Sequence, residues 1–140
     1  YIPMLMDTGG NAGSQASVTI IRSLSLNQVN FKDIGKVIWK ELRVSIMVGA
    51  TLAIANFGKL MLIDNMLFKN TAVTLQVSLV ICLTIFMIVV VAKFIGCTLP
   101  ILTKKLGFDP TVMASPFITT IVDALGLLVY FQIASNLLSI

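Results

Sequence analysis

The sequence contains no histidine and only two cysteines. Without histidine, the usual general base, the Ser-His-Asp triad and histidine-ligated zinc sites are all excluded. Cys82 and Cys97 fall within one expected helix, where they are separated by roughly 22 Å, too far for a disulfide inside that helix. Both are therefore predicted to be core residues, and these absences weigh against a soluble-type enzyme.

Charged residues are also scarce. They make up 11% of the 140 residues, against 57% hydrophobic residues and a mean hydropathy of +0.99, whereas soluble domains carry about 25% charged residues. The length leaves room for four membrane spans of about 20 residues each. We therefore predict an all-α membrane protein, in which a bundle of transmembrane helices forms one domain over residues 1–140.

The predicted spans cover roughly residues 1–24, 37–63, 72–102 and 110–138. The net charge of +4 does not indicate nucleic acid, because the basic residues lie between apolar runs without an aromatic-basic surface. The first connection carries five Lys and Arg residues over residues 22–43 and the third carries two, Lys104 and Lys105, against two in the second, Lys59 and Lys69. The positive-inside rule therefore places the first and third connections in the cytoplasm. Because the chain opens within an apolar helix, we expect one further span upstream.

Several single residues predict where helices begin or end and where side chains lie. Asp109-Pro110 is predicted to start the last helix, because Asp caps free N–H groups and Pro is tolerated in the first turn. Pro100 is expected to kink or finish the third span. Lys93 is expected to snorkel to the cytoplasmic interface, with an acid inside the bundle as the alternative partner. Met4 and Met6 are interpreted as packing residues.

Asp123 is the single charged residue between Pro110 and Ile140. An ionisable group at the centre of a membrane helix costs about 2.5 kcal/mol or more, so it usually serves a pathway, a partner or an ion. Helical spacing places Thr119 and Thr120 on the same face. The alternatives are an ion site, a proton site, or a helix contact in which Thr hydroxyls and a protonated Asp join neighbouring helices.

The first span carries a second polar face. Asp7, Asn11 and Ser14 or Gln15 recur at helical spacing, and Gly9 and Gly13 form a GxxxG pair that allows close helix packing. The segment suits a tightly packed pore-lining helix or a broken helix that lines an ion path. The oxygen ligands favour Mg²⁺ over a transition metal, and Ca²⁺, Mn²⁺ and a proton path remain open.

Asp7-Thr8-Gly9 also matches the short D-T-G signature of aspartic proteases, in which two carboxylates share a proton. In those soluble enzymes the signature lies on a loop between strands, whereas here it continues into an apolar helical segment. Three functions of the protein thus remain open. They are an ion pathway, a proton-coupled carrier of divalent cations, and an intramembrane protease that uses Asp7 and Asp123.

Two sequence runs carry a resemblance to a known family: PMLMDTGGNAGSQASVTIIRSL over residues 3–24 and LGFDPTVMASPFITTIVDALGLLVYF over residues 106–131. Together with their spacing, they resemble the transmembrane domain of MgtE-type magnesium channels. The resemblance implies a homodimeric, Mg²⁺-selective channel of the bacterial cytoplasmic (inner) membrane, with no enzymatic activity. It implies five transmembrane helices per subunit, of which this chain holds the second to fifth. The first helix and the cytoplasmic Mg²⁺-sensing domains lie outside the chain.

The resemblance also implies site residues. Asp123 matches the pore aspartate that binds the hydrated ion, and Asn11 matches a pore-lining amide. Ser115 stands where some relatives carry a pore Asn, and Lys93 stands where at least one relative is neutral. The complete pore-lining set expected is Asp7, Gly9, Gly10, Asn11, Ser115, Thr119 and Thr120, while Gly13 and Gln15 match the same helix motif. The resemblance implies that Mg²⁺ is the transported ion, and the expected partners are a second copy of the chain and membrane lipid.

Overall fold

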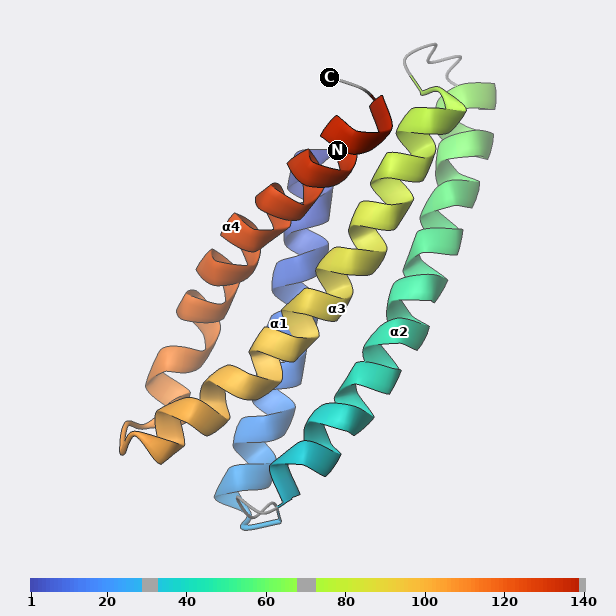
Figure 1. Cartoon of the computed structure of the whole chain (residues 1–140). Coiled ribbons are helices and arrows are strands. Elements are labelled where there is room, and N and C mark those ends of the chain that lie inside the picture. The colour runs from blue at the N-terminus through green and yellow to red at the C-terminus, as the bar shows by residue number, and fades with distance from the viewer. Residues whose placement is uncertain (29–32, 68–72, 139–140) are drawn as a thin grey trace.

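The computed structural model describes residues 1–28, 33–67 and 73–138. Every regular element in these ranges is helical: α1 (Ile2–Ser25), α2 (Ile34–Lys59), the π-helix η2 (Leu60–Leu67), α3 (Leu75–Lys105) and α4 (Pro110–Leu138). Successive long helices run in opposite directions along one elongated bundle (Figure 1). The predicted all-α fold class is confirmed.

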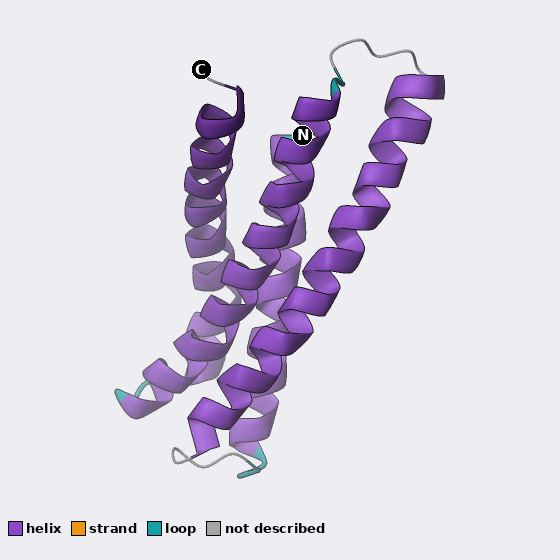
Figure 2. Cartoon of the chain, turned by 45° about the vertical axis from the view of Figure 1, so that its right-hand side comes forward, coloured by secondary structure: helices purple, strands orange, loops and turns teal. Residues whose placement is uncertain are grey.

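Three segments are long and apolar enough to cross a membrane: Ile34–Asp64, Leu75–Lys105 and Pro116–Leu138, with mean hydropathies of 1.8, 2.8 and 1.8. The fourth expected span, α1, is not among them. Its 24 residues would reach about 36 Å at 1.5 Å per residue, so length is not the reason. Polar side chains on α1 lower its hydropathy, although it lies alongside the other helices (Figures 1 and 2).

Helix α3 lies at the centre of the bundle and contacts α1, α2 and α4, while α1 also packs against α4. Because lipid tails are as apolar as leucine, close van der Waals packing supplies much of the attraction between such helices. The core is built from branched aliphatic side chains of α3, including Ile81, Ile85, Ile88 and Val89, packed with Leu5 of α1 and with Ile118 and Val122 of α4.

Two glycines allow α1 and α3 to approach closely. A Cβ atom added to Gly96 would collide with the carbonyl oxygen of Gly13. One added to Gly13 would lie 2.9 Å from Cγ2 of Ile118 and 3.1 Å from the carbonyl oxygen of Ala92. Helix α1 is also continuous from Ile2 to Ser25. Of the two expectations for its glycine-rich run, the structure therefore shows a tightly packed helix and not a broken one.

The second and third helices extend beyond their expected ends. Residues 60–67 continue α2 as a π-helix, past the expected end at residue 63, in a stretch without glycine or proline. Helix α3 passes through Pro100 and ends at Lys105, so Pro100 does not finish it. Gly107 follows with a φ of 81°, and the Phe108 N–H donates to the Thr103 carbonyl at 3.0 Å, which is a glycine-dependent helix stop.

Helix α4 begins at Pro110, as the sequence predicts. The Asp109 carboxylate accepts hydrogen bonds from the Thr111 backbone N–H at 2.8 Å and from the Thr111 hydroxyl at 2.6 Å. These bonds stabilise the charged form and lower the pKa of Asp109 below its usual 3.8. The cap fixes where α4 starts, and therefore the height at which Asp123 lies in the bundle.

Candidate functional site

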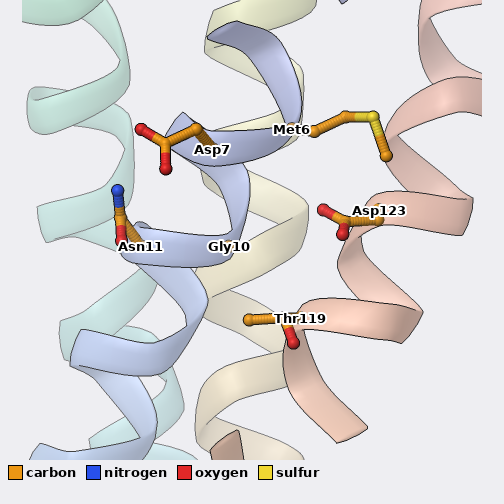
Figure 3. Close-up of a pocket in the computed structure, with 6 residues that line it drawn as sticks. All are labelled: Met6, Asp7, Gly10, Asn11, Thr119 and Asp123. Atoms are coloured by element: carbon orange, nitrogen blue, oxygen red, sulfur yellow. The ribbon is translucent and has the colours of Figure 1, made fainter. Parts of the chain in front are cut away.

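A polar hollow of about 180 Å³ lies between α1 and α4. Its lining residues are Met6, Asp7, Gly10 and Asn11 from α1 and Thr119 and Asp123 from α4 (Figure 3). Gly10 is buried and has no side chain, so the α1 backbone forms the wall nearest to Thr119. The two polar faces recognised in the sequence thus meet in one hollow, which also includes Met6, interpreted from sequence as a packing residue.

The side chains around this hollow point in different directions. The Asp123 carboxylate points from α4 toward α1, whereas the Asp7 and Asn11 side chains lie on the side of α1 that faces away from α4 (Figure 3). Asp7 and Asp123 therefore line one hollow without facing each other. Asp123 is half-buried, and Asp7 and Asn11 are exposed on the isolated chain.

Threonine hydroxyls near Asp123 are hydrogen-bonded to the helix backbone. Thr119 and Thr120 donate to the carbonyl oxygen of Pro116 at 3.0 and 2.9 Å. Thr119 lines the hollow, but Thr120 is exposed and lines a different, mainly apolar depression with Pro116 and Phe117. Of the two threonines expected near Asp123, one is brought into the hollow.

Gly9 and Ser115 are the two other residues expected to line a pore, and neither is among the described residues that line this hollow. Gly9 is buried, and a Cβ atom there would lie 3.0 Å from Cγ1 of Val122 and would collide with Ile88, so Gly9 belongs to the helix packing and not to the hollow. Ser115 lies within α4, and its side chain is outside the part of the chain that the structure describes.

A second hollow of about 250 Å³ lies on the other side of α1, toward α2 and α3. Its polar lining residues are Asp7, Thr8, Asn11, Gln15 and Lys93, and Val48 and Leu52 of α2 contribute apolar walls. Because Asp7 and Asn11 line both hollows, the polar face of α1 joins them.

Lys93 does not snorkel to the interface. The residue is only 9% exposed, and its Nζ atom lies 3.7 Å from Oε2 of Glu41 on α2. The expectation of snorkelling was wrong, and the alternative, an acid partner inside the bundle, is confirmed: Glu41, near the start of the expected second span, lies beside Lys93 in the folded bundle. A buried ammonium needs such a partner, and single-sequence patterns do not connect residues on different helices.

An exposed polar strip runs along α1. Asp7, Asn11 and Gln15 recur every four residues and are all exposed on the single chain. Contact with lipid tails would leave these side chains without hydrogen-bond partners, at a cost of several kcal/mol for each unsatisfied group. The strip therefore suits water or another protein surface.

The ligand chemistry of the hollow is dominated by oxygen. Asp7, Asn11, Thr119 and Asp123 offer carboxylate, amide and hydroxyl oxygens, which suit hard cations such as Mg²⁺. Within the described ranges, no three His, Cys, Asp or Glu side chains gather into a metal-binding cluster. One copy of the chain thus offers carboxylates and neutral oxygens to an ion, without a closed cage.

A helical bundle with three segments long and apolar enough to cross a membrane, and with a carboxylate-lined hollow, defines a polytopic membrane domain. The comparison with family models gives the family: the MgtE model, described as a divalent cation transporter, matches residues 2–133. The chain belongs to the MgtE family. Its members are transporters, in agreement with the expectation that the chain is not an enzyme.

Curated relatives support the assignment along nearly the whole chain. The protein named "Magnesium transporter MgtE" from Thermus thermophilus is 33% identical over 138 residues, covering 99% of this chain and 29% of the relative. Those of the same name from Bacillus subtilis and Enterococcus faecalis are 33% and 32% identical over 135 residues, covering 96% of this chain and 28% of each relative. The chain spans less than a third of the length of these relatives.

Proposed function

We propose that this chain forms the ion pathway of a magnesium transporter, with Asp123 as the carboxylate that holds a hydrated Mg²⁺ ion. The observation that carries the proposal is the position of Asp123 in the polar hollow between α1 and α4. The matched relatives are named magnesium transporters. Their names and the oxygen-rich hollow support the same function.

The ion keeps much of its water in this proposal. Mg²⁺ loses water reluctantly and is usually held through one or two carboxylates with several waters retained. Asp123 attracts and holds the hydrated ion, while Asn11 and Thr119 accept hydrogen bonds from its waters. Gly10 leaves room for that hydration shell, because a side chain at this position would extend toward Thr119.

We further propose that two copies of the chain form the pathway together. A two-fold axis near the α1–α4 hollow would bring two Asp123 carboxylates to one ion. The exposed strip of Asp7, Asn11 and Gln15 supports this arrangement, because a shared aqueous pathway satisfies polar groups that lipid would not. The proposed location is the bacterial cytoplasmic membrane, with the basic ends of α1 and α3 on the cytoplasmic side.

Two other functions follow from a lone membrane carboxylate. A proton-coupled carrier would use Asp123 as its proton site, and the flux experiment below distinguishes it. A protease would need Asp7 and Asp123 to share a proton across a short distance. The orientation of Asp7 away from α4 favours the ion pathway over that alternative (Figure 3).

The test is replacement of Asp123 by Asn, which keeps the size of the side chain and removes its charge. We expect the rate of Mg²⁺ uptake into proteoliposomes to fall at least about tenfold, because the ion loses its nearest fixed negative charge. Uptake is measured with a fluorescent Mg²⁺ indicator trapped inside the vesicles. The matched control is Asp33→Asn, which removes an exposed carboxylate paired with Lys36 and outside the hollow.

Normal uptake by the Asp123→Asn variant would contradict the proposed role. Uptake that disappears when the pH gradient is collapsed, at constant membrane potential, would support the proton-coupled carrier instead. Flux that follows the membrane potential and ignores the pH gradient is the result expected of an ion channel.

A further inference from the structure

We propose that a groove between the start of α2 and the end of α3 binds an anionic phospholipid, with an acyl chain in the groove and the headgroup phosphate on Lys105. The groove has a volume of about 230 Å³. It is lined by Ile34 and Ile38 of α2 and by Thr98, Leu99, Ile101, Leu102 and Lys105 of α3. It is separate from both polar hollows.

The floor and walls of the groove are aliphatic. Ile101 is 5% exposed and packs on the inner core, whereas Leu102 is 52% exposed and stands at the open side. Ile34 and Ile38 are one turn apart and therefore project from the same face of α2. The Thr98 hydroxyl donates to the Phe94 carbonyl at 2.8 Å, so its polar atom is already satisfied. This surface fits a hydrocarbon chain.

One cation lies at the end of the aliphatic surface. Lys105 is the last residue of α3 and is exposed. Its neighbour Lys104 donates to the carbonyl oxygen of Leu24 at 3.0 Å and so ties α3 to the end of α1. Lys105 instead lines the groove, where its methylene stem can lie along apolar surface with its ammonium group at the membrane surface.

The position of the groove matches the depth of a lipid headgroup. It lies at the end of the bundle where α1 and α3 finish and α2 and α4 begin (Figure 1). Trp39, 62% exposed, is close in sequence to Ile38 and suits the interfacial region. The basic residues of the helices at this end are Arg22, Lys36, Lys40, Arg43, Lys104 and Lys105. Basic pockets between membrane helices on the cytoplasmic side bind anionic headgroups.

The positive charge of Lys105 favours an anionic lipid over a neutral one as the occupant of the groove. A neutral phosphatidylcholine carries a quaternary ammonium beyond its phosphate, which reduces the net attraction to Lys105, whereas phosphatidylglycerol offers the phosphate charge alone. A second protein helix could fill the apolar floor, but it would gain from Lys105 only by placing an acid there. An anionic phospholipid satisfies both parts of the groove.

The experiment is native mass spectrometry of the purified protein in mild detergent with equal amounts of phosphatidylglycerol and phosphatidylcholine. We expect the protein to retain phosphatidylglycerol preferentially. Lys105→Gln should lower that preference about fivefold, the factor corresponding to about 1 kcal/mol for one basic residue. Ile38→Trp should fill the groove and reduce retention of both lipids.

The matched control is Lys36→Gln. It removes the same charge at the same end of the bundle, but its side chain is 87% exposed and lies about 200° around α2 from Ile34 and Ile38. The lipid preference of this variant should equal that of the unaltered protein. Lys105→Gln is the decisive variant, because Lys105 is exposed at the end of α3 and its replacement should not disturb folding.

Four results would overturn the proposal: equal retention of the two lipids, an equal loss of preference in Lys105→Gln and Lys36→Gln, displacement of the lipid by soluble glycerophosphate, or a change of oligomer mass in Ile38→Trp. The third would indicate a phosphate site without a role for the acyl chain, and the fourth a protein contact. None depends on transport, so the lipid site and the proposed function stand or fall separately.

Discussion

At the scale of single residues, two charged side chains inside the bundle, Asp123 and Lys93, have different surroundings. Asp123 faces a polar hollow in which an ion or water can reach it. Lys93 instead packs near Glu41, with the two side chains 11% and 15% exposed. A charge left without a partner at such a depth costs more than an ordinary polar group. The carboxylate is therefore available for function, while the ammonium joins α3 to α2.

This pairing predicts an unequal effect of single and double replacements. Lys93→Met should lower the free energy of unfolding by about 3 kcal/mol, because Glu41 would remain buried without its counter-charge. The double variant Lys93→Met with Glu41→Gln should lose much less, since no isolated charge remains. Unfolding by increasing mole fractions of sodium dodecyl sulfate in mixed micelles measures both.

Lys36→Gln serves as the comparison for that measurement, because it breaks an exposed ion pair with Asp33. Exposed pairs contribute only about 0–1 kcal/mol, so this variant should unfold close to the unaltered protein. Equal stability of the single Lys93→Met and the double variant would show that Glu41 and Lys93 are not energetically coupled.

At the scale of helices, one local sequence signal predicted a helix end correctly and another did not. Asp109-Pro110 started α4 as expected, because capping depends on residues adjacent in sequence. Pro100 did not end α3. An internal proline removes one backbone hydrogen bond, and the packing of α3 against three helices supports the helix on both sides of it.

The contact between α1 and α3 predicts a sharp difference between two identical substitutions. Gly96→Ala should lower the free energy of unfolding by about 2 kcal/mol, because the added methyl group would force the Gly13 backbone away. Gly58→Ala places its methyl group where no atom lies within 4 Å. It should be neutral or stabilise the helix by up to about 1 kcal/mol.

The same detergent unfolding assay compares the two glycine variants. Both changes add one methyl group within a helix, so intrinsic helix propensity affects them alike. If Gly96→Ala proved as stable as Gly58→Ala, the close α1–α3 approach would not be a structural requirement.

At the scale of the whole molecule, nothing in the described part of one chain covers the polar strip on α1. Asp7, Asn11 and Gln15 are exposed, and α2 and α4 flank the strip without closing over it, as the two hollows show. The proposed dimer accounts for this surface by placing it along a shared pathway.

A cross-linking experiment tests the proposed dimer. Gln15→Cys should give a covalent dimer with a short bis-maleimide in membranes, because two copies of the strip would face one pathway. Met47→Cys should not, since Met47 is 72% exposed on α2 and is not among the residues that line the hollow with Gln15. The native Cys82 and Cys97 are buried, so the introduced thiol is the reactive one, and gel electrophoresis measures the product.

Equal cross-linking at both positions, or none at Gln15, would contradict this arrangement. It would leave the ion-binding role of Asp123 to be judged by the uptake experiment alone. The two measurements thus separate the assembly of the pathway from its chemistry.

The sequence by itself determined the helical membrane class, the start of α4 and the identity of the polar faces on α1 and α4. These features depend on composition, hydropathy and residues adjacent along one helix. Only the tertiary structure decided that Asp123 and Gly10 line one hollow, that Gly9 packs against Ile88, and that Lys93 lies beside Glu41. The rotation and height of each helix relative to its neighbours fix these contacts, and close packing between distant residues sets both.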